Sequence, residues 1–204
     1  MDVIDKLAQI FKEFPGIGER QARRFVYFLM ARSPAYNENF SELVKELKKE
    51  TAQCSECFRF FVSGNKKSEL CGVCANANTD PSVLMIVEKD SDLESIKKSG
   101  TYDGKYLVLG GLVPIVEKNI KSRVRIEELK KKIITESKTL KEIILAFSLN
   151  PQGDHTDSYI REEIKELTNK HGIKVSSLGR GLSTGTELEY SDNDTLKNAL
   201  KNRQ

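Results

Sequence analysis

Four cysteines constrain the fold of this chain more than any other feature of its sequence. They form two Cys-x-x-Cys pairs with thirteen residues between the pairs, and the chain has no others: Cys54, Cys57, Cys71 and Cys74. Two such turns can each direct two thiolates at one metal ion, and residues 58–70 have the length of a short hairpin that returns the second pair to the first. This spacing predicts one structural Zn²⁺ per chain, bound by all four thiolates in a zinc-finger module over residues 53–78.

The alternative to a metal site is a pair of disulfides, as in a small secreted domain. Residues 1–10 carry charge throughout and contain no apolar segment of the signal-peptide type. We therefore expect a cytoplasmic protein whose thiols stay reduced. Four thiolates complete a tetrahedral shell and leave no position for a catalytic water, so the predicted zinc is a structural element of the fold.

Three phenylalanines lie between the cysteine pairs, at Phe58, Phe60 and Phe61. Aromatic side chains can stack on nucleic-acid bases, but a small zinc module also needs aromatic cover for its own core. We predict that all three rings pack in the core of the zinc module.

The composition is that of an ordinary soluble protein, with 38% hydrophobic and 31% charged residues in a chain of 204. Its formal net charge of +3 is too small to indicate nucleic-acid binding by itself, so a DNA-binding surface has to be local. No apolar run of the sequence approaches the ~20 residues that a membrane-spanning helix needs. We expect one main domain with smaller accessory regions and no membrane partner.

The N-terminal region, residues 1–52, carries the pattern of a helical hairpin. Apolar residues at helical spacing predict a first helix over residues 3–11 and a second over residues 19–31. Between them, a proline and the glycines Gly16 and Gly18 forbid a continuous helix. This pattern resembles the helix-hairpin-helix motif of DNA-repair proteins, in which a Gly–apolar–Gly hairpin presents backbone N–H groups to a phosphate. A plain turn between two helices is the alternative.

Arginines on the second helix favour the DNA-binding interpretation. From Arg20 to Arg32 the sequence contains four arginines and no acidic residue. Because contacts to phosphate do not read bases, the predicted binding is independent of DNA sequence. The predicted DNA-binding residues are the hairpin glycines and the arginines of the next turns: Gly16, Gly18, Arg20, Arg23 and Arg24.

Beyond residue 79, strand patterns alternate with helical patterns. Four apolar runs rich in β-branched residues predict strands over residues 83–87, 106–109, 143–147 and 173–178. Strands that are buried on both faces and joined by helical crossovers form parallel sheets. The sequence therefore predicts an α/β domain with a mainly parallel sheet over residues 79–174, and an α+β multi-module fold for the chain as a whole.

Polar residues follow the ends of these strands, in a pattern that resembles the Toprim fold of topoisomerases, primases and related nucleases. That fold holds magnesium with a glutamate after its first strand and an Asp-x-Asp after its third. Glu88 matches the glutamate, but Asn150 and Gln152 stand in place of the two aspartates, and neutral amides cannot supply the charge that holds Mg²⁺. We assign no catalytic residue, and we interpret Glu88, Asp92 and Asp154 as a partner-binding surface or a weak cation site.

The order of these motifs resembles the bacterial RecR family of recombination mediators over essentially the whole chain. The resemblance extends to Gly-Lys-Tyr-Leu-Val-Leu-Gly-Gly at residues 104–111 and to Gly-Arg-Gly-Leu at residues 179–182, within a C-terminal segment over residues 175–204. It implies a non-enzymatic DNA clamp in the recombinational repair of DNA damage, associated with the nucleoid. It also implies that RecO and RecF are partners with which the clamp loads RecA at single-stranded gaps.

Two other functions compete with this interpretation. A Toprim-type nuclease or topoisomerase with a structural zinc finger is the first, and the amides Asn150 and Gln152 argue against it. A zinc-stabilised interaction domain with no DNA role is the second, and the arginine-rich segment from Arg20 to Arg32 argues against it.

The chain is also expected to form a homo-oligomer. Helix-hairpin-helix units commonly work in pairs across a two-fold axis, and this sequence contains a single copy. We predict that apolar residues left over on the short N-terminal helices, such as Ile4, Phe11 and Phe28, form an isologous contact. The family resemblance implies a further step, from the dimer to a homotetrameric ring.

Overall fold

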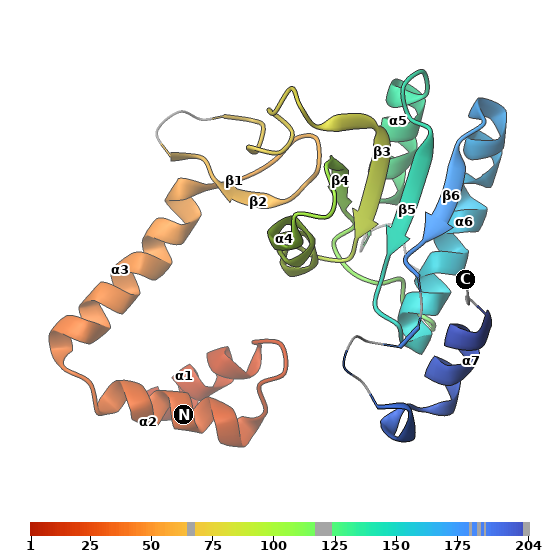
Figure 1. Ribbon diagram of the computed structural model, residues 1–204. Helices are drawn as coiled ribbons and strands as arrows, with labels where there is room; N and C mark the ends of the chain where they lie inside the picture. Colours follow the sequence, from red (N-terminus) through yellow and green to blue (C-terminus); the bar gives the residue numbers. More distant parts are fainter. Residues whose placement is uncertain (65–67, 117–123, 180, 183–184, 186, 202–204) are drawn as a thin grey trace. The chain divides into compact units, whose positions relative to one another are not determined.

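The computed structural model of the chain describes residues 1–64, 68–116, 124–179, 181–182, 185 and 187–201 (Figure 1). It divides into two compact units, Met1–Thr51 and Ala52–Gln204. None of the helices in the described residues has the length and apolar character needed to cross a bilayer.

The first unit consists of three helices, α1 (Val3–Lys12), α2 (Glu19–Met30) and α3 (Pro34–Glu50). Side chains cap two of them, because Asp2 accepts a hydrogen bond from the backbone N–H of Asp5 at α1 and Ser33 accepts one from Tyr36 at α3. The small core of the unit joins α1 to α2 and contains Ala8, Phe11, Ala22 and Val26. The two predicted helices and the break between them are thus present.

The second unit is built on a parallel sheet of four strands, in the order β4-β3-β5-β6 (Figure 1). These strands are β3 (Asp80–Val87), β4 (Gly104–Val108), β5 (Glu142–Ala146) and β6 (Lys174–Ser177). Every adjacent pair is parallel. The predicted α/β domain with a parallel sheet is confirmed, with strand ends that differ from the expected ones by a few residues.

Helical crossovers cover both faces of this sheet: α4 (Asp90–Ser99), α5 (Ile126–Glu136) and α6 (Pro151–His171). In the central strand β3, side chains alternate between two clusters. Leu84 and Ile86 lie in the larger one, with apolar residues of α5 and α6. Met85 and Val87 point to the other face, where Leu93 of α4 packs beside three of the cysteines.

The cysteine module shares this second cluster with the sheet. It contains the short strands β1 (Thr51–Gln53) and β2 (Phe60–Val62). The backbone N–H of Val108 in β4 donates to the carbonyl of Cys57 at 2.8 Å. The side chain of Asp90 in α4 accepts from the backbone N–H of Phe60 at 2.7 Å. The module is therefore attached to the sheet both by hydrogen bonds and by a common core.

Beyond β6, which runs into the predicted C-terminal segment, the described residues form the 3₁₀ helix η3 (Leu188–Tyr190) and the helix α7 (Asn193–Lys201). Arg180, which belongs to the tail motif quoted above, lies outside the described residues.

Candidate metal centre and candidate nucleic-acid interface

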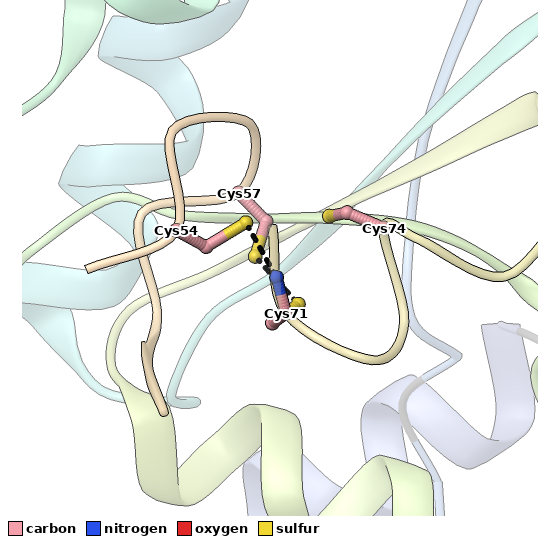
Figure 2. Close-up of side chains that lie close together, drawn as sticks. All are labelled: Cys54, Cys57, Cys71 and Cys74. Carbon is pink, nitrogen blue, oxygen red and sulfur yellow. Dashed lines mark hydrogen bonds between the residues drawn. The ribbon is translucent and has the colours of Figure 1, made fainter. Parts of the chain in front are cut away.

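The four cysteine side chains point toward one another (Figure 2). Their sulfur atoms all lie within 4.8 Å of one another, and the Cys57 and Cys71 sulfurs are 3.6 Å apart. A ZnS₄ tetrahedron with bonds of about 2.3 Å has sulfurs about 3.8 Å apart. Three of the cysteines are buried, Cys74 is half-buried, and none forms a disulfide. The cluster therefore fits a closed, thiolate-bound metal ion.

The cysteine sulfurs lie close enough for each thiol to change the pKa of its neighbours. Hydrogen bonds from the Cys57 and Cys74 thiols lower the pKa of Cys71. The shared hydrogen bond with Cys71 raises the pKa of Cys57 to about 12, and hydrogen bonds to Cys57 and Cys71 likewise raise that of Cys74. Four thiolate charges this close together need a cation, and a bound Zn²⁺ would supply one.

Backbone hydrogen bonds hold the two Cys-x-x-Cys turns in place. Phe58 donates to the carbonyl of Cys54 at 3.0 Å, and Ala75 donates to that of Cys71 at 2.9 Å, so each pair is closed by a turn of the same kind. Phe58 adopts a left-handed conformation with φ of 61°, which is unusual for a bulky residue. The backbone N–H of Cys71 also donates to the Cys54 sulfur at 3.4 Å, which joins the two turns directly (Figure 2).

The three phenylalanines of the module do not all lie in a core. Phe58 packs against the larger cluster of the sheet and Phe61 against the smaller one. Phe60 is 56% exposed, because successive residues of β2 point to opposite sides and its side points to solvent. The expectation of a core position was therefore wrong for Phe60.

An ion-pair network around the buried Lys132, which was not predicted from the sequence, joins the cysteine module to α5. Lys132 is 8% exposed, and its ammonium lies 2.7 Å from Glu56 and 3.1 Å from Glu136. Lys105 also pairs with Glu136, at 2.7 Å. Burial by itself would lower the pKa of Lys132, but the two carboxylates raise it. No sequence pattern indicates this network, since Glu56 and Lys132 are 76 residues apart.

The hairpin between α1 and α2 leaves the N-terminus of α2 open. Gly16 has a φ of +77°, which a residue with a side chain rarely adopts, and no atom lies within 4 Å of the place where its Cβ would be. Gly18 caps α2 without any side-chain hydrogen bond, in contrast to the capped starts of α1 and α3. The first backbone N–H groups of α2 are thus available to an anion.

The three arginines predicted to contact DNA lie in different surroundings. Arg23 is half-buried and pairs with Asp5 of α1 at 3.0 Å and with Glu19 at 3.9 Å, so it links two helices. Arg20 and Arg24 are exposed, and Arg24 donates to the side chain of Gln21 at 3.1 Å. Two positive charges one turn apart are therefore presented to solvent beside the open helix end.

Among the described residues, the carboxyl edge of the sheet gathers no group of three or more metal-ligating side chains. Within the described parts of the chain, the cysteine cluster is the only group of three or more His, Cys, Asp or Glu that could hold an ion. Glu88, Asp92 and Asp154 are not brought into such a group. The hydroxyl of Ser148 donates to Glu88 at 3.4 Å, and Lys89 lies 3.8 Å from it.

Asn150 has a structural role at this edge. Its side chain accepts a hydrogen bond from the backbone N–H of Gly153 at 2.8 Å and so caps α6. A Cβ on Gly153 would lie 1.9 Å from the carbonyl oxygen of Ser148. The Asn-Pro-Gln-Gly run is therefore a tight helix start. An Asn cap followed by Pro at the first helical position is a sequence pattern from which this helix start could have been predicted.

Comparisons with known proteins assign the chain to a family. Residues 82–179 match the family model of the Toprim domain, and residues 181–204 match that of the RecR C-terminal region. The chain is 34% identical over 201 residues to Recombination protein RecR of Lactobacillus acidophilus, an alignment that covers 98% of this chain and 96% of the relative. The chain belongs to the RecR family. Recombination protein RecR of Acidothermus cellulolyticus is 33% identical over 204 residues, with 100% and 94% covered.

Membership of the RecR family agrees with the arrangement described above. The Toprim match begins inside β3 and ends just after β6, so it includes residues of all four strands of the parallel sheet. The RecR C-terminal match covers η3 and α7. Both of these relatives carry the name of a recombination protein and not that of an enzyme.

Proposed function

We propose that this RecR-family chain is a non-enzymatic DNA clamp of recombinational repair, which acts with RecO- and RecF-type mediators to load RecA at single-stranded gaps. The observation that carries the DNA-binding part is the open N-terminus of α2, with Arg20 and Arg24 exposed beside it. Backbone N–H groups and arginines both favour phosphate oxygens. Gly16, Gly18, Arg20 and Arg24 would then hold the DNA backbone, and Arg23 would set the angle between the two helices.

Replacing Arg20 and Arg24 together by alanine should weaken DNA binding about tenfold or more at low salt, for all sequences alike. Each lost phosphate contact should also lower the slope of log Kd against log salt, by about 0.9 on duplex DNA and by about 0.7 on a single strand. Fluorescence anisotropy with a labelled oligonucleotide at several salt concentrations measures both quantities.

The matched control for this pair is Lys48→Ala with Lys49→Ala, which removes the same charge from an exposed part of α3. We expect the lysine variant to bind DNA almost as the unmodified chain does. Equal binding by the arginine variant and the unmodified chain at about 0.1 M salt would refute the assignment of the hairpin.

We further propose that the Toprim domain carries out no phosphodiester chemistry. A two-metal reaction needs carboxylates that gather two cations, whereas Asn150 uses its side chain to cap α6. The exposed carboxylates at this edge can instead attract a basic partner surface. We therefore keep Glu88, Asp92 and Asp154 as predicted contacts of a partner protein.

An apolar groove in the first unit supports the proposal of an oligomer. The groove has a volume of about 770 Å³ and is lined by side chains of all three helices. Its exposed apolar members include Val3, Met30 and Val44. Of the residues predicted for the isologous contact, Ile4 and Phe11 line the groove, and Phe28 does not. Phe11 is mostly buried in the core of the unit.

Val44→Asp should shift the chain toward the monomer, because it places a charge in a groove that we propose a second copy covers. Light scattering over a concentration series measures the change in mass. Leu47→Asp is the control, since Leu47 is also exposed on α3, at 63% against 54% for Val44, but is not among the groove residues. If the unmodified chain is monomeric at tens of micromolar, pairing through this groove is excluded.

A further inference from the structure

An exposed cluster of two aromatic rings and one arginine lies where α2 passes into α3. The guanidinium carbon of Arg32 is 4.1 Å from the centre of the Phe28 ring and 5.7 Å from that of Tyr36. The two rings are 6.2 Å apart and nearly perpendicular. Phe28 is 45% exposed and Tyr36 is 43% exposed. Two aromatic side chains and a positive charge are thus presented together to solvent.

The backbone around this cluster is held in place by hydrogen bonds. Ser33 caps α3 by accepting from the backbone N–H of Tyr36 at 3.3 Å. The side chain of Asn37 donates to the carbonyl of Leu29 at 3.2 Å, which ties the start of α3 to the end of α2. The aromatic residues are therefore presented by ordered helix ends, so a ligand would meet them with little loss of conformational entropy.

Basic residues continue from this cluster along α2. Arg20, Arg24 and Phe28 are spaced four residues apart, so they lie along one side of the helix, and Arg32 follows just beyond its end. The distance along the axis from Arg20 to Phe28 is roughly 12 Å. Neither Arg20 nor Arg32 has an ion-pair partner among the residues that the structure describes. This row of basic side chains runs from the open N-terminus of α2 to the aromatic rings.

We propose that Phe28, Arg32 and Tyr36 form a stacking platform for an unpaired base of single-stranded DNA, whose backbone runs past Arg20 and Arg24. The proposal rests on the DNA-binding function proposed above and adds a site for bases to the site for phosphates. Bases stack on aromatic rings and on guanidinium planes whatever their sequence, and a basic groove or stripe beside the rings tracks the backbone. A nucleotide strand offers a flat base that can stack on these rings and phosphates whose negative charge complements the arginines.

A second copy of the chain fits this surface less well. The sequence from Arg20 to Tyr36 contains no acidic residue, so a two-fold contact centred here would bring Arg32 close to its own copy. The apolar groove that suits a second copy contains none of Phe28, Arg32 and Tyr36. A single-stranded nucleic acid is therefore the occupant that the charge of the surface favours.

Binding of the full chain to two oligonucleotides of equal length tests the platform. One is a run of thymidines, and in the other the bases are removed but all phosphates remain. The unmodified chain should bind the intact strand at least about fivefold more tightly than the abasic strand. Phe28→Leu combined with Tyr36→Leu should remove this preference and leave binding to the abasic strand unchanged.

Two control variants separate the platform from the hairpin and from other exposed rings. Arg20→Ala with Arg24→Ala should weaken binding to both strands by the same factor. Phe60→Leu removes an exposed ring from β2 and should leave the preference intact. Melting temperatures of all variants show whether each one is folded.

Three results would overturn the platform. The first is equal binding of the intact and abasic strands by the unmodified chain, which removes the stacking site but leaves phosphate binding. The second is a preference that follows Phe60 in place of Phe28. The third is a Phe28 and Tyr36 variant that changes its oligomer mass but keeps its preference for the intact strand. The cluster would then belong to a contact between copies of the chain. Failure to bind either strand would instead count against the proposed function.

Discussion

Removing the metal from the purified protein should unfold the cysteine module and loosen the face of the sheet that it covers. Cys54, Cys57 and Cys71 share a core with Met85 and Val87 of the central strand, so the proposed zinc sits inside the second unit. Structural zinc sites contribute about 10 kcal/mol or more to the folding of small modules. Even a loss of about 5 kcal/mol would lower Tm by roughly 10 to 20 °C in a chain of this size.

Cys71→Ser is the variant that tests the same point without a chelator. It should purify with much less than one zinc per chain and show the lowered Tm, because one of four ligands is lost from a closed shell. Ser55→Ala, in the first Cys-x-x-Cys turn, should keep one zinc and nearly the full Tm. A Cys71→Ser protein with full metal content and full stability would contradict the metal assignment.

Gly153→Ala should destabilise the second unit by about 3 kcal/mol, through overpacking at the start of α6. In most helices this change stabilises, because alanine is the better helix former. Here the new methyl would lie 1.9 Å from the Ser148 carbonyl oxygen and 3.0 Å from its carbon, and both atoms belong to the backbone. The start of α6 would have to move, and the Asn150 cap would weaken with it.

Urea unfolding of Gly153→Ala measures this cost. Gly179→Ala is the matched control, because Gly179 is exposed and no atom lies within 4 Å of the place for its Cβ. We expect the control to change the free energy of unfolding by less than about 0.5 kcal/mol. An unchanged or raised stability of Gly153→Ala would mean that the turn from β5 into α6 can relax at low cost.

The parts of the fold that follow local patterns could be predicted from the sequence. The β-branched runs predicted the four strands of the sheet. The Pro-Gly-Ile-Gly break predicted where α1 ends and where α2 begins. The spacing of the cysteines was sufficient to predict their cluster, because two pairs of ligands, each pair with two residues between its members, have few ways to meet.

The parts that depend on contacts between distant residues could not be predicted. Arg23 resembled its neighbours in sequence, but Asp5, eighteen residues away, takes it into an ion pair. The pairing of Lys132 with Glu56 depends on how the cysteine module docks against α5. Phe60 is exposed because the cysteine module packs against the rest of the second unit with the other side of β2. Each of these outcomes is set by tertiary packing, which local periodicity does not encode.

The most direct test of the proposed function is RecA loading on gapped DNA that is coated with single-strand-binding protein. ATP hydrolysis by RecA, measured in the presence of RecO and RecF, reports the replacement of single-strand-binding protein by RecA on the DNA. Our account predicts that the unmodified chain accelerates the appearance of this activity, that the Arg20 and Arg24 variant does so much less, and that the DNA is recovered uncut. An unchanged rate of RecA loading when the chain is added, or cleavage of the DNA, would contradict the proposal of a non-enzymatic recombination clamp.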